Sequence, residues 1–409
     1  MVFDPHDLSL VILLVGAVIV AAILTRALLE RTKVPPLLGF MFLGFLLNAV
    51  DRLTPWNVLT EGSLGVLEFL SAVGIIALLF RIGLESDLPG LVHQLPRAGV
   101  IWIGNILLSG IPGYVTARYL LGFELVPSLF VAVAFTATSV GVSMRVWQER
   151  NALNSDTGEL LIDVAELDDI SGVAFMAILF AIVPILHGES NGPLWGEMLG
   201  TAALFIMKLA AFTAVCIVFS RYIEKHLTNL FTRLGKRQEP MLLVAGTGIV
   251  IAALAGWLGF SLAIGALFAG LVFCRDPNAV KQDASFGAIY ELFTPFFFIG
   301  IGLKIQPDAF GAAWLPALVL LLIAVFGKFI GTGLPALVEA APAGALLIGI
   351  SMVPRAEITM IIIERGRSLG DWAVPPNLFA AMVVISAATC LIAPLVLDYL
   401  LQRNKQSHR

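Results

Sequence analysis

The sequence predicts an all-α protein that crosses a membrane many times, and three observations support this fold class. Hydrophobic residues make up 58% of the 409 residues and charged residues only 13%, whereas a soluble domain carries about 45–50% apolar and about 25% charged residues. About thirteen stretches reach or approach the roughly 20 mostly apolar residues that a membrane-spanning helix needs. The two halves of the chain also share short motifs in the same order. A water-soluble enzyme is nearly excluded.

Short polar breaks, or breaks rich in Pro and Gly, separate the predicted helices. The helices run near 7–29, 36–50, 63–83, 97–122, 127–147, 160–185, 196–223, 241–257, 259–274, 287–304, 312–338, 342–363 and 376–402. The second, eighth and ninth are short. Residues 1–8 carry two acids and no Lys or Arg, so we expect no cleaved signal peptide and a first helix that stays in the protein.

The basic residues indicate the orientation of the helices. With the N-terminus outside, the outward loops hold only Arg52, Arg118, Lys304, Arg365 and Arg367, and most other Lys and Arg residues face inward. The positive-inside rule therefore predicts a multi-pass membrane protein with the N-terminus outside and the C-terminus in the cytoplasm. An odd number of spans agrees with this. The net charge is only −4, which gives no sign of a nucleic-acid partner.

Two pairs of segments indicate an internal repeat. Residues 38–44 (LGFMFLG) resemble 264–270 (IGALFAG), and residues 82–85 (IGLE) resemble 301–304 (IGLK). Six helices, a linker helix at 196–223 and six further helices would turn the second half upside down, as in many secondary transporters. The alternative is chance similarity between Gly-rich apolar segments.

Four acids within seven residues of the stretch 160–185 form the most informative feature. Asp163, Glu166 and Asp169 share one helical face, and Asp168 lies about 100° round from Asp169. We expect Asp163 and Glu166 to line a cytoplasmic funnel that ends at Asp169. A carboxylate removed from water can hold either a proton or a cation, and this competition couples the two flows. The alternative for Asp163 and Glu166 is a favourable place in the first, wet turns of the helix.

A lysine lies in the middle of the stretch 312–338, with no acid near it in sequence. The partner of Lys328 must therefore come from another helix, and Asp168 is the candidate. Gly327 and Gly331 would allow that helix to approach closely. The alternative is a lysine that snorkels to the interface.

Two stretches have the composition of broken helices, at equivalent places in the two halves. Hydroxyls and a glycine interrupt 127–147 at residues 136–141, and Pro354 interrupts 342–363. Unwound backbone at membrane depth can line a cavity and offer oxygen ligands to a cation. Ordinary hydrogen bonding between helices is the alternative for the hydroxyls. We expect Arg355 and Glu357 to stabilise each other or a crossing helix.

Cysteine and histidine placement argues against metal, redox or hydrolytic chemistry. Cys216, Cys274 and Cys390 lie far apart inside apolar runs, so we expect reduced packing residues. The five histidines are scattered, and no HExxH or GxSxG motif occurs. An intramembrane hydrolase is therefore disfavoured.

Six motifs together resemble the monovalent cation:proton antiporter-2 family, especially its bacterial Na+/H+ antiporters, over essentially the whole chain. These are Leu78–Glu85, Thr136–Gly141, Leu167–Ile170, Gly265–Gly270, Pro295–Phe298 and Val353–Glu357. The resemblance implies thirteen helices in two inverted repeats with crossing broken helices. It also implies a homodimer whose core moves like an elevator, with core helices at about 63–185 and 287–402 and dimerisation helices at about 7–50 and 196–274.

The resemblance also implies roles for individual residues. Asp169 would bind the cation and the proton, and Asp168 would pair with Lys328. The residues at the crossing would be Thr136, Thr138, Ser139 and Pro354. We therefore expect electrogenic exchange of Na+ or Li+ for H+ across the bilayer, without a cofactor.

Some features depart from the family pattern, and two other functions stay open. Ala356 stands where the family usually has glycine, and Asp163 and Glu166 where it has apolar or small residues. The chain stops at Arg409, so we expect no soluble regulatory domain. A K+/H+ antiporter would use the same site. A sodium-coupled symporter of organic anions would be expected to show a strongly polar substrate pocket, which the sequence does not indicate.

Overall fold

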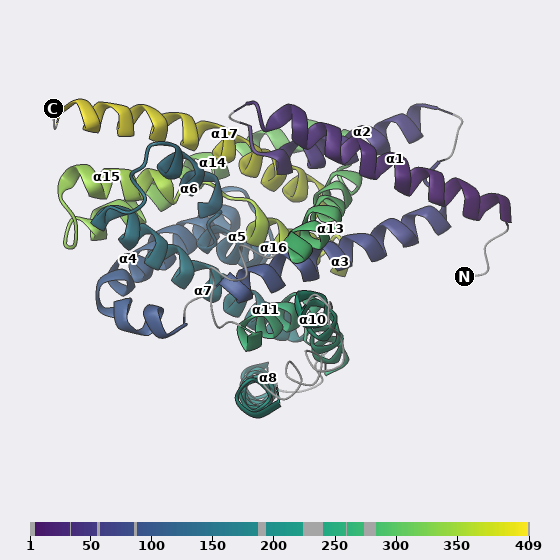
Figure 1. Cartoon of the computed structure of the whole chain (residues 1–409), viewed down its shortest axis with the longest axis horizontal. Helices are drawn as coiled ribbons and strands as arrows, with labels where there is room; N and C mark the ends of the chain where they lie inside the picture. Colours follow the sequence, from purple (N-terminus) through teal and green to yellow (C-terminus); the bar gives the residue numbers. More distant parts are fainter. Residues whose placement is uncertain are drawn as a thin grey trace. The chain divides into compact units, whose positions relative to one another are not determined.

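A computed structural model of the chain describes residues 5–32, 34–54, 58–85, 88–186, 194–223, 240–258, 260–273 and 284–407. All regular structure in these residues is helical, so the predicted all-α class is confirmed (Figure 1). The helices are α1 Pro5–Leu29, α2 Pro36–Leu53, α3 Glu61–Glu85, α4 Leu88–Val115, η1 Thr116–Leu120, α5 Leu125–Thr136, α6 Val140–Glu149, α7 Asp156–Leu186, α8 Leu194–Val218, η2 Phe219–Ile223, α10 Pro240–Trp257, α11 Leu262–Phe273, α13 Ala284–Leu303, η3 Pro307–Ala309, α14 Phe310–Ala336, α15 Pro342–Ser351, α16 Glu357–Leu369 and α17 Pro376–Ser407.

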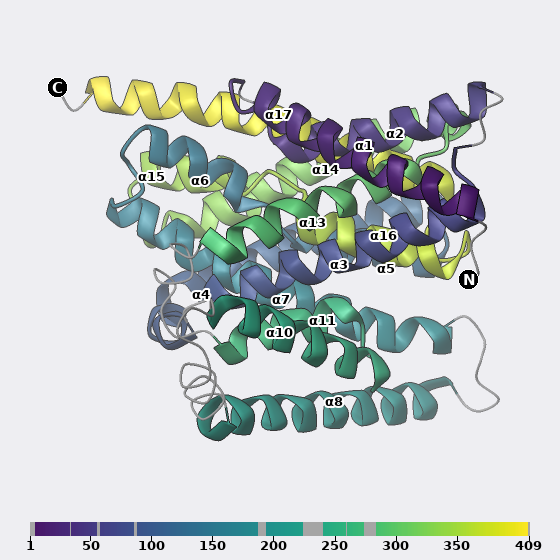
Figure 2. The ribbon, with the colours of Figure 1, turned by 45° about the vertical axis from the view of Figure 1, so that its right-hand side comes forward.

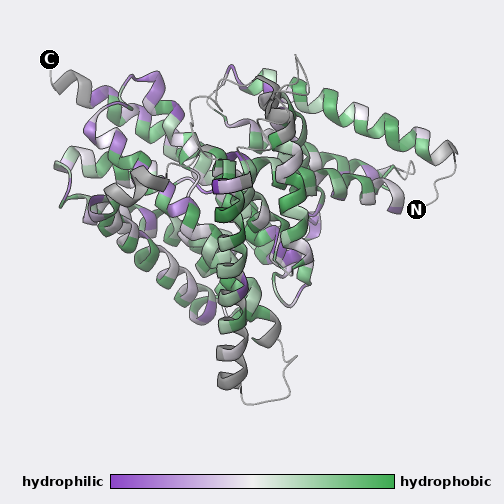
Figure 3. Cartoon of the chain, turned by 60° about the horizontal axis from the view of Figure 1, so that its bottom comes forward, coloured by the Kyte–Doolittle hydropathy of each residue, from purple (hydrophilic) through white to green (hydrophobic). Residues whose placement is uncertain are grey.

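The helices have the composition of membrane spans. Among the described residues, seven helices are long and apolar enough to cross a membrane, and five shorter apolar helices accompany them. Figure 3 shows hydrophobic residues along most of the helix lengths. Many large apolar side chains are exposed, including Leu28 and Trp257, as expected of a surface that faces lipid rather than water. The predicted count of thirteen spans stays a prediction.

The chain forms two compact units. Unit 1 consists of residues 1–25, 40–87 and 188–304, and unit 2 of residues 26–39, 88–187 and 305–409. This division differs from the expected one in two respects. Helices α3 and α13 belong to unit 1 rather than to the group that carries the predicted site, and residues 26–39 belong to unit 2 rather than to the predicted dimerisation helices. Which unit mediates dimerisation stays a prediction.

Glycine contacts explain why α3 and α13 belong to unit 1, and they pair the repeated motifs crosswise. A Cβ atom at Gly83 in α3 would lie 2.9 Å from the Cα atom of Gly270 in α11. One at Gly302 in α13 would lie 2.9 Å from the Cα atom of Gly44 in α2. Because neither glycine has room for a side chain, the backbones touch. Each first motif therefore packs against the second motif of the other half, an exchange that agrees with a two-fold relation between the repeats.

Side-chain contacts complete unit 1. The amide of Asn48 in α2 donates to the carbonyl oxygen of Leu303 in α13 at 2.9 Å. Helices α8, α10 and α11 lie side by side (Figure 2), and Phe212 of α8 packs against Phe260 and Phe268 at its contact with α11. Cys216 is buried and free, as Cys390 is in unit 2, whereas Cys274 lies outside the described residues.

Unit 2 is built around α4, which packs against α5, α7 and α14. Gly104 and Gly331 allow α4 and α14 to approach, since a Cβ atom at Gly331 would lie 3.0 Å from the Gly104 carbonyl oxygen. A Cβ atom at Gly327, one turn earlier, would lie 2.8 Å from the carbonyl oxygen of Leu108. Gly327 and Gly331 therefore do allow a close helix contact, but the neighbour is α4, not the helix of the predicted partner Asp168, which is α7.

Candidate ion-binding site

The two broken helices of unit 2 meet at their breaks. Residues 137–139 separate α5 from α6, and residues 352–356 separate α15 from α16. The backbone N–H of Ser139 donates to the carbonyl oxygen of Pro354 at 2.8 Å, which joins one break directly to the other. The structure thus brings together the residues predicted at the crossing, all of them buried: Thr136, Thr138, Ser139 and Pro354.

A buried arginine caps the C-terminal end of α5, whose last carbonyl groups have no partner within the helix. Arg355 donates to the carbonyl oxygens of Ala134 and Ala137 at 3.3 Å each and also to that of Phe135, whose ring centroid lies 4.4 Å from the guanidinium carbon. A further bond of 3.2 Å reaches the carbonyl oxygen of Ala324 in α14. A cation at a helix C-terminus interacts favourably with the unsatisfied carbonyls and the helix dipole.

The expected ion pair between Arg355 and Glu357 does not form. Glu357 instead accepts a hydrogen bond from the Ser139 hydroxyl across the crossing. Residues two apart in a helix do not face each other, and Arg355 precedes the first turn of α16, so its side chain reaches the free carbonyls of α5. The other expectation for this pair, that it stabilises a crossing helix, describes the observed contacts.

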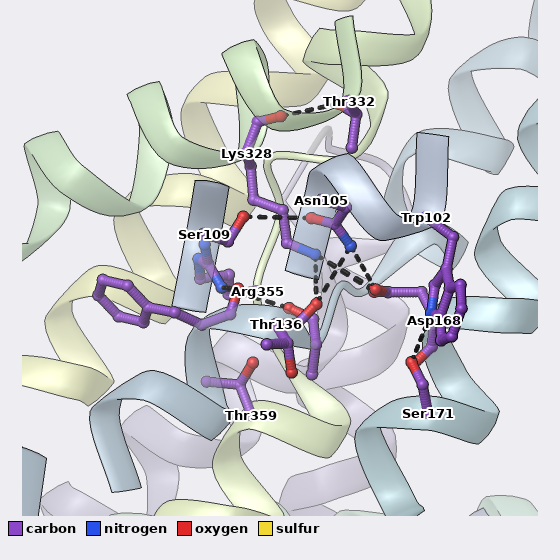
Figure 4. Close-up of polar contacts among 12 residues, drawn as sticks. Trp102, Asn105, Ser109, Thr136, Asp168, Ser171, Lys328, Thr332, Arg355 and Thr359 are labelled. Atoms are coloured by element: carbon purple, nitrogen blue, oxygen red, sulfur yellow. Dashed lines mark hydrogen bonds and ion pairs between the residues drawn. The ribbon is translucent and has the colours of Figure 1, made fainter. Parts of the chain in front are cut away.

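A fully buried ion pair joins α7 to α14. Lys328 Nζ lies 3.3 Å from Asp168 Oδ2, and both side chains are 0% exposed. Lys328 also donates to the carbonyl oxygen of Thr136, the last residue of α5. The structure therefore brings together the predicted partners, and Lys328 together with Arg355 provides two cations at the C-terminal end of α5 (Figure 4).

Asn105 in α4 belongs to this cluster, although the sequence interpretation did not include it. Its side chain is fully buried, and its Nδ2 donates to Asp168 Oδ1 at 2.5 Å. Its Oδ1 accepts from the Ser109 hydroxyl at 3.1 Å. Trp102 reaches the same aspartate indirectly, because its indole N–H donates to Ser171 Oγ, which in turn donates to the Asp168 carbonyl oxygen.

The sequence does contain a signal for the α4 residues of this cluster. Trp102, Asn105 and Ser109 stand at positions i, i+3 and i+7 of an otherwise apolar segment, so they share one face of α4. Figure 4 shows these side chains pointing toward Asp168 and Lys328.

Asp169 lies beside the pair but is differently placed. Its side chain is half-buried, and it makes no hydrogen bond or ion pair with another described residue. Its carboxylate lies within electrostatic range of Asp168, Glu357, Lys328 and Glu166. In the crossing, the buried Thr138 hydroxyl oxygen also lacks a hydrogen-bond partner among the described residues. Oxygen atoms with unused lone pairs are the ligands that a hard cation or a proton takes up.

One cavity of unit 2 is lined by residues other than those of the predicted funnel, which stays a prediction. A cavity of about 200 Å³ has the following lining: Thr32, Pro35, Pro36, Leu37, Gly141, Val142, Arg145, Val146, Glu149, Glu357, Pro394 and Asp398. Asp163 and Glu166 are half-buried on α7 and do not line it. Glu357 connects the cavity to the crossing, because it also accepts the Ser139 bond. The acids at this cavity come from α6, α16 and α17 rather than from the first turns of α7.

Three comparisons relate this arrangement to known proteins. The family described as sodium/hydrogen exchanger, transmembrane, matches residues 18–403. The high-affinity Na+/H+ antiporter NhaS3 of Synechocystis is 27% identical over 80% of this chain and 70% of its own length. The Na+/H+-K+ antiporter GerN of Bacillus cereus is 27% identical over 94% of this chain and 95% of its own length.

A solved structure shares the fold. The sodium proton antiporter MjNhaP1 from Methanocaldococcus jannaschii superposes with a TM-score of 0.71 over 97% of this chain and 99% of that chain. The sequence identity is only 15%, so this likeness supports the helical architecture alone.

Proposed function

This chain belongs to the sodium/hydrogen exchanger family, and we propose that it exchanges Na+ or Li+ for H+ electrogenically across the plasma membrane. The exchange of a monovalent cation for protons agrees with every relative described above. In this proposal sodium leaves the cytoplasm while protons enter, with the N-terminus outside and the C-terminus inside, as the distribution of basic residues favours.

The carboxylate of Asp169 carries the proposal. It is half-buried, it is unpaired among the described residues, and it stands next to an aspartate that is already paired. A proton and a cation therefore compete for one group. If the site changes sides only when occupied, a proton that arrives from one side displaces a cation brought from the other, and the two flows are coupled. Thr138 and Ser139 at the crossing are candidates for further oxygen ligands.

Lys328 supports the electrogenic form of this exchange. It is fully buried beside Asp168, where the charged form of a lysine is costly unless its partner stays ionised. A lysine that releases and regains a proton adds a second titrating group to Asp169. The number of protons per cation can then exceed one, and each cycle moves net charge.

The placement of the whole site in unit 2 supports an elevator mechanism. Asn105, Asp168, Asp169, Lys328 and Arg355 all belong to this unit, so the ion would travel with one body. In this mechanism unit 2 moves and unit 1 forms the scaffold and the homodimer contact. The crosswise glycine contacts make unit 1 a tightly packed body, which suits that role.

Exchange of potassium for protons at the same site is the second candidate. It is favoured by the similarity to GerN, whose name includes both ions.

Purified protein in vesicles tests the proposal. With an imposed pH gradient, addition of Na+ or Li+ should collapse the gradient, and K+ should not. The matched control is Asp169→Asn, which keeps the shape of the side chain and removes its charge, and it should abolish the response. A gradient that only K+ collapses would establish the second candidate. Robust cation-driven pH change in Asp169→Asn would reject the assignment of the site.

A further inference from the structure

We infer that Asn105 is a positioning residue for transport, which shares the Asp168 carboxylate with Lys328 and so sets how tightly Lys328 holds its proton. The inference rests on the proposed function, in which Lys328 gains and releases a proton. Asn105 Nδ2 lies 2.5 Å from Asp168 Oδ1, whereas Lys328 Nζ lies 3.3 Å from Asp168 Oδ2. Lys328 Nζ also lies 3.5 Å from Oδ1, so among the described residues this oxygen has donors from both α4 and α14, and Oδ2 has Lys328 alone.

The orientation of the Asn105 amide is fixed by its neighbours. Ser109 Oγ lies 3.1 Å from Asn105 Oδ1, so the carbonyl end of the amide is occupied by a hydroxyl. The NH2 end faces Asp168 and also lies 3.4 Å from the Thr136 carbonyl oxygen. Because the side chain is fully buried, no water from bulk solvent replaces these bonds, and a lost donor leaves the acceptor unsatisfied.

The two donors differ in one decisive property, because an amide does not titrate and an ammonium does. When Lys328 releases its proton, the ionised Asp168 keeps one donor from Asn105. Without Asn105, the Lys328 ammonium becomes the main compensation for the buried carboxylate, and deprotonation costs more free energy. Lys328 would then keep its proton to higher pH.

Other charged groups near the pair are unchanged by a substitution at Asn105. The charged groups that face the Asp168–Lys328 pair from the surrounding elements are Asp169 and Glu166 on α7, Glu357 on α16 and Arg355 at the break before α16. None of these residues is a hydrogen-bond partner of Asn105 in the structure. A change in the pH dependence of Asn105→Leu therefore reports the bond to Asp168.

The test is the pH profile of sodium-driven exchange in vesicles for Asn105→Leu, which keeps the branched shape of the side chain and has no donor. The midpoint of activation should move to higher pH by about one unit, since a hydrogen bond to a charged group is comparable in free energy to one pH unit. Ser128→Ala is the matched control, because Ser128 is also fully buried in unit 2 but bonds only to backbone near the start of α5. Its midpoint should not move.

A double substitution asks whether Asn105 acts through Lys328. In the background Lys328→Gln, adding Asn105→Leu should give no further shift, because no proton on residue 328 remains to be held. Asn105→Ser keeps a shorter donor and covers the case in which leucine prevents folding, and it should shift the midpoint in the same direction by less.

Several results would overturn the inference while leaving the proposed function intact. These are an unchanged midpoint in Asn105→Leu, an equal shift in Ser128→Ala, a full shift in the Lys328→Gln background, or loss of exchange at every pH in both folded Asn105 variants. Failure of the wild-type protein to exchange sodium for protons would instead remove the proposed function itself.

Discussion

Lys328 and Asp168 form an ion pair with no exposure to solvent, although they are far apart in sequence and lie on different helices. Removing one member of a buried pair leaves an uncompensated charge, which typically costs about 3–5 kcal/mol. Here the Asn105 amide still bonds to Asp168 when Lys328 is changed. Lys328 likewise keeps its bond to the Thr136 carbonyl oxygen when Asp168 is changed. Each member of the pair therefore retains one partner, and a single substitution at either position should cost less than the loss of an isolated buried pair.

Lys328→Gln should keep sodium-driven exchange but reduce or remove its response to membrane potential. Glutamine retains a donor for Asp168 but cannot titrate, so one of the two proton-carrying groups is lost. The measurement compares exchange rates in vesicles at zero potential and at an imposed potassium-diffusion potential. An unchanged potential response would reject the role of Lys328 as the second titrating group.

Competition at Asp169 predicts a specific pH dependence. As pH falls, protons occupy more of Asp169, so the apparent KM for Na+ should rise. In Lys328→Gln, where the second titrating group is absent, the maximal rate at saturating Na+ should stay nearly constant. Where protonation limits binding fully, the KM should rise about tenfold for each unit of pH. Rates measured over a range of Na+ concentrations at several pH values check this. A maximal rate that falls at constant KM would mean that the proton acts at a separate site.

Arg355→Gln should destabilise unit 2 rather than alter ion choice. The arginine bonds to the carbonyl oxygens of Ala134, Ala137 and Ala324 in addition to Phe135, and a buried acceptor without a partner costs about 1–3 kcal/mol. The melting temperature of the detergent-solubilised protein should fall clearly. Arg355→Lys keeps the charge but has fewer donors, so its melting temperature should lie between those of the wild-type protein and Arg355→Gln. Normal stability of Arg355→Gln would contradict the capping role of this side chain.

Gly83→Ala and Gly270→Ala should each destabilise the protein by about 1–3 kcal/mol, the usual cost of overpacking. Each added methyl group would meet the backbone of the opposite helix. Gly246→Ala, also in a helix of unit 1, is the control, because a Cβ atom there has no neighbour within 4 Å. It should be neutral or stabilising by up to about 1 kcal/mol. Equal thermal shifts at all three positions would refute the close contact.

Much of the fold and part of the site could be predicted from the sequence for a physical reason. Charges and helix breaks are costly inside a membrane, so Asp168, Lys328 and Pro354 stand out against an apolar background. Their positions on separate helices then leave few possible partners. The all-α architecture is confirmed, and the breaks do cross at Ser139 and Pro354.

Other parts of the site could not be predicted in this way. Asn105 carries no charge and interrupts no helix, so neither feature distinguishes it in a segment that has the composition of an ordinary membrane helix. The sequence leaves Glu357 and a crossing helix as equal alternatives for Arg355, and in the structure its partners are the free carbonyls at the end of α5. Such carbonyls are invisible in a sequence until the exact end of a helix is known. The grouping of α3 with α11 depended on glycine contacts across the two halves.

The crosswise glycine contacts have a consequence for biogenesis. Gly83 contacts Gly270 and Gly44 contacts Gly302, so each contact joins residues far apart in the sequence. The hydrogen bond from Asn48 to Leu303 spans 255 positions. As the chain emerges from the ribosome, α2 and α3 enter the bilayer long before their partners exist. Contacts of such long range are slow to form, because the intervening chain must first be ordered. Unit 1 therefore closes only after most of the protein has been synthesised, and a chain truncated before α13 would leave the bare glycine face of α2 open to other helices.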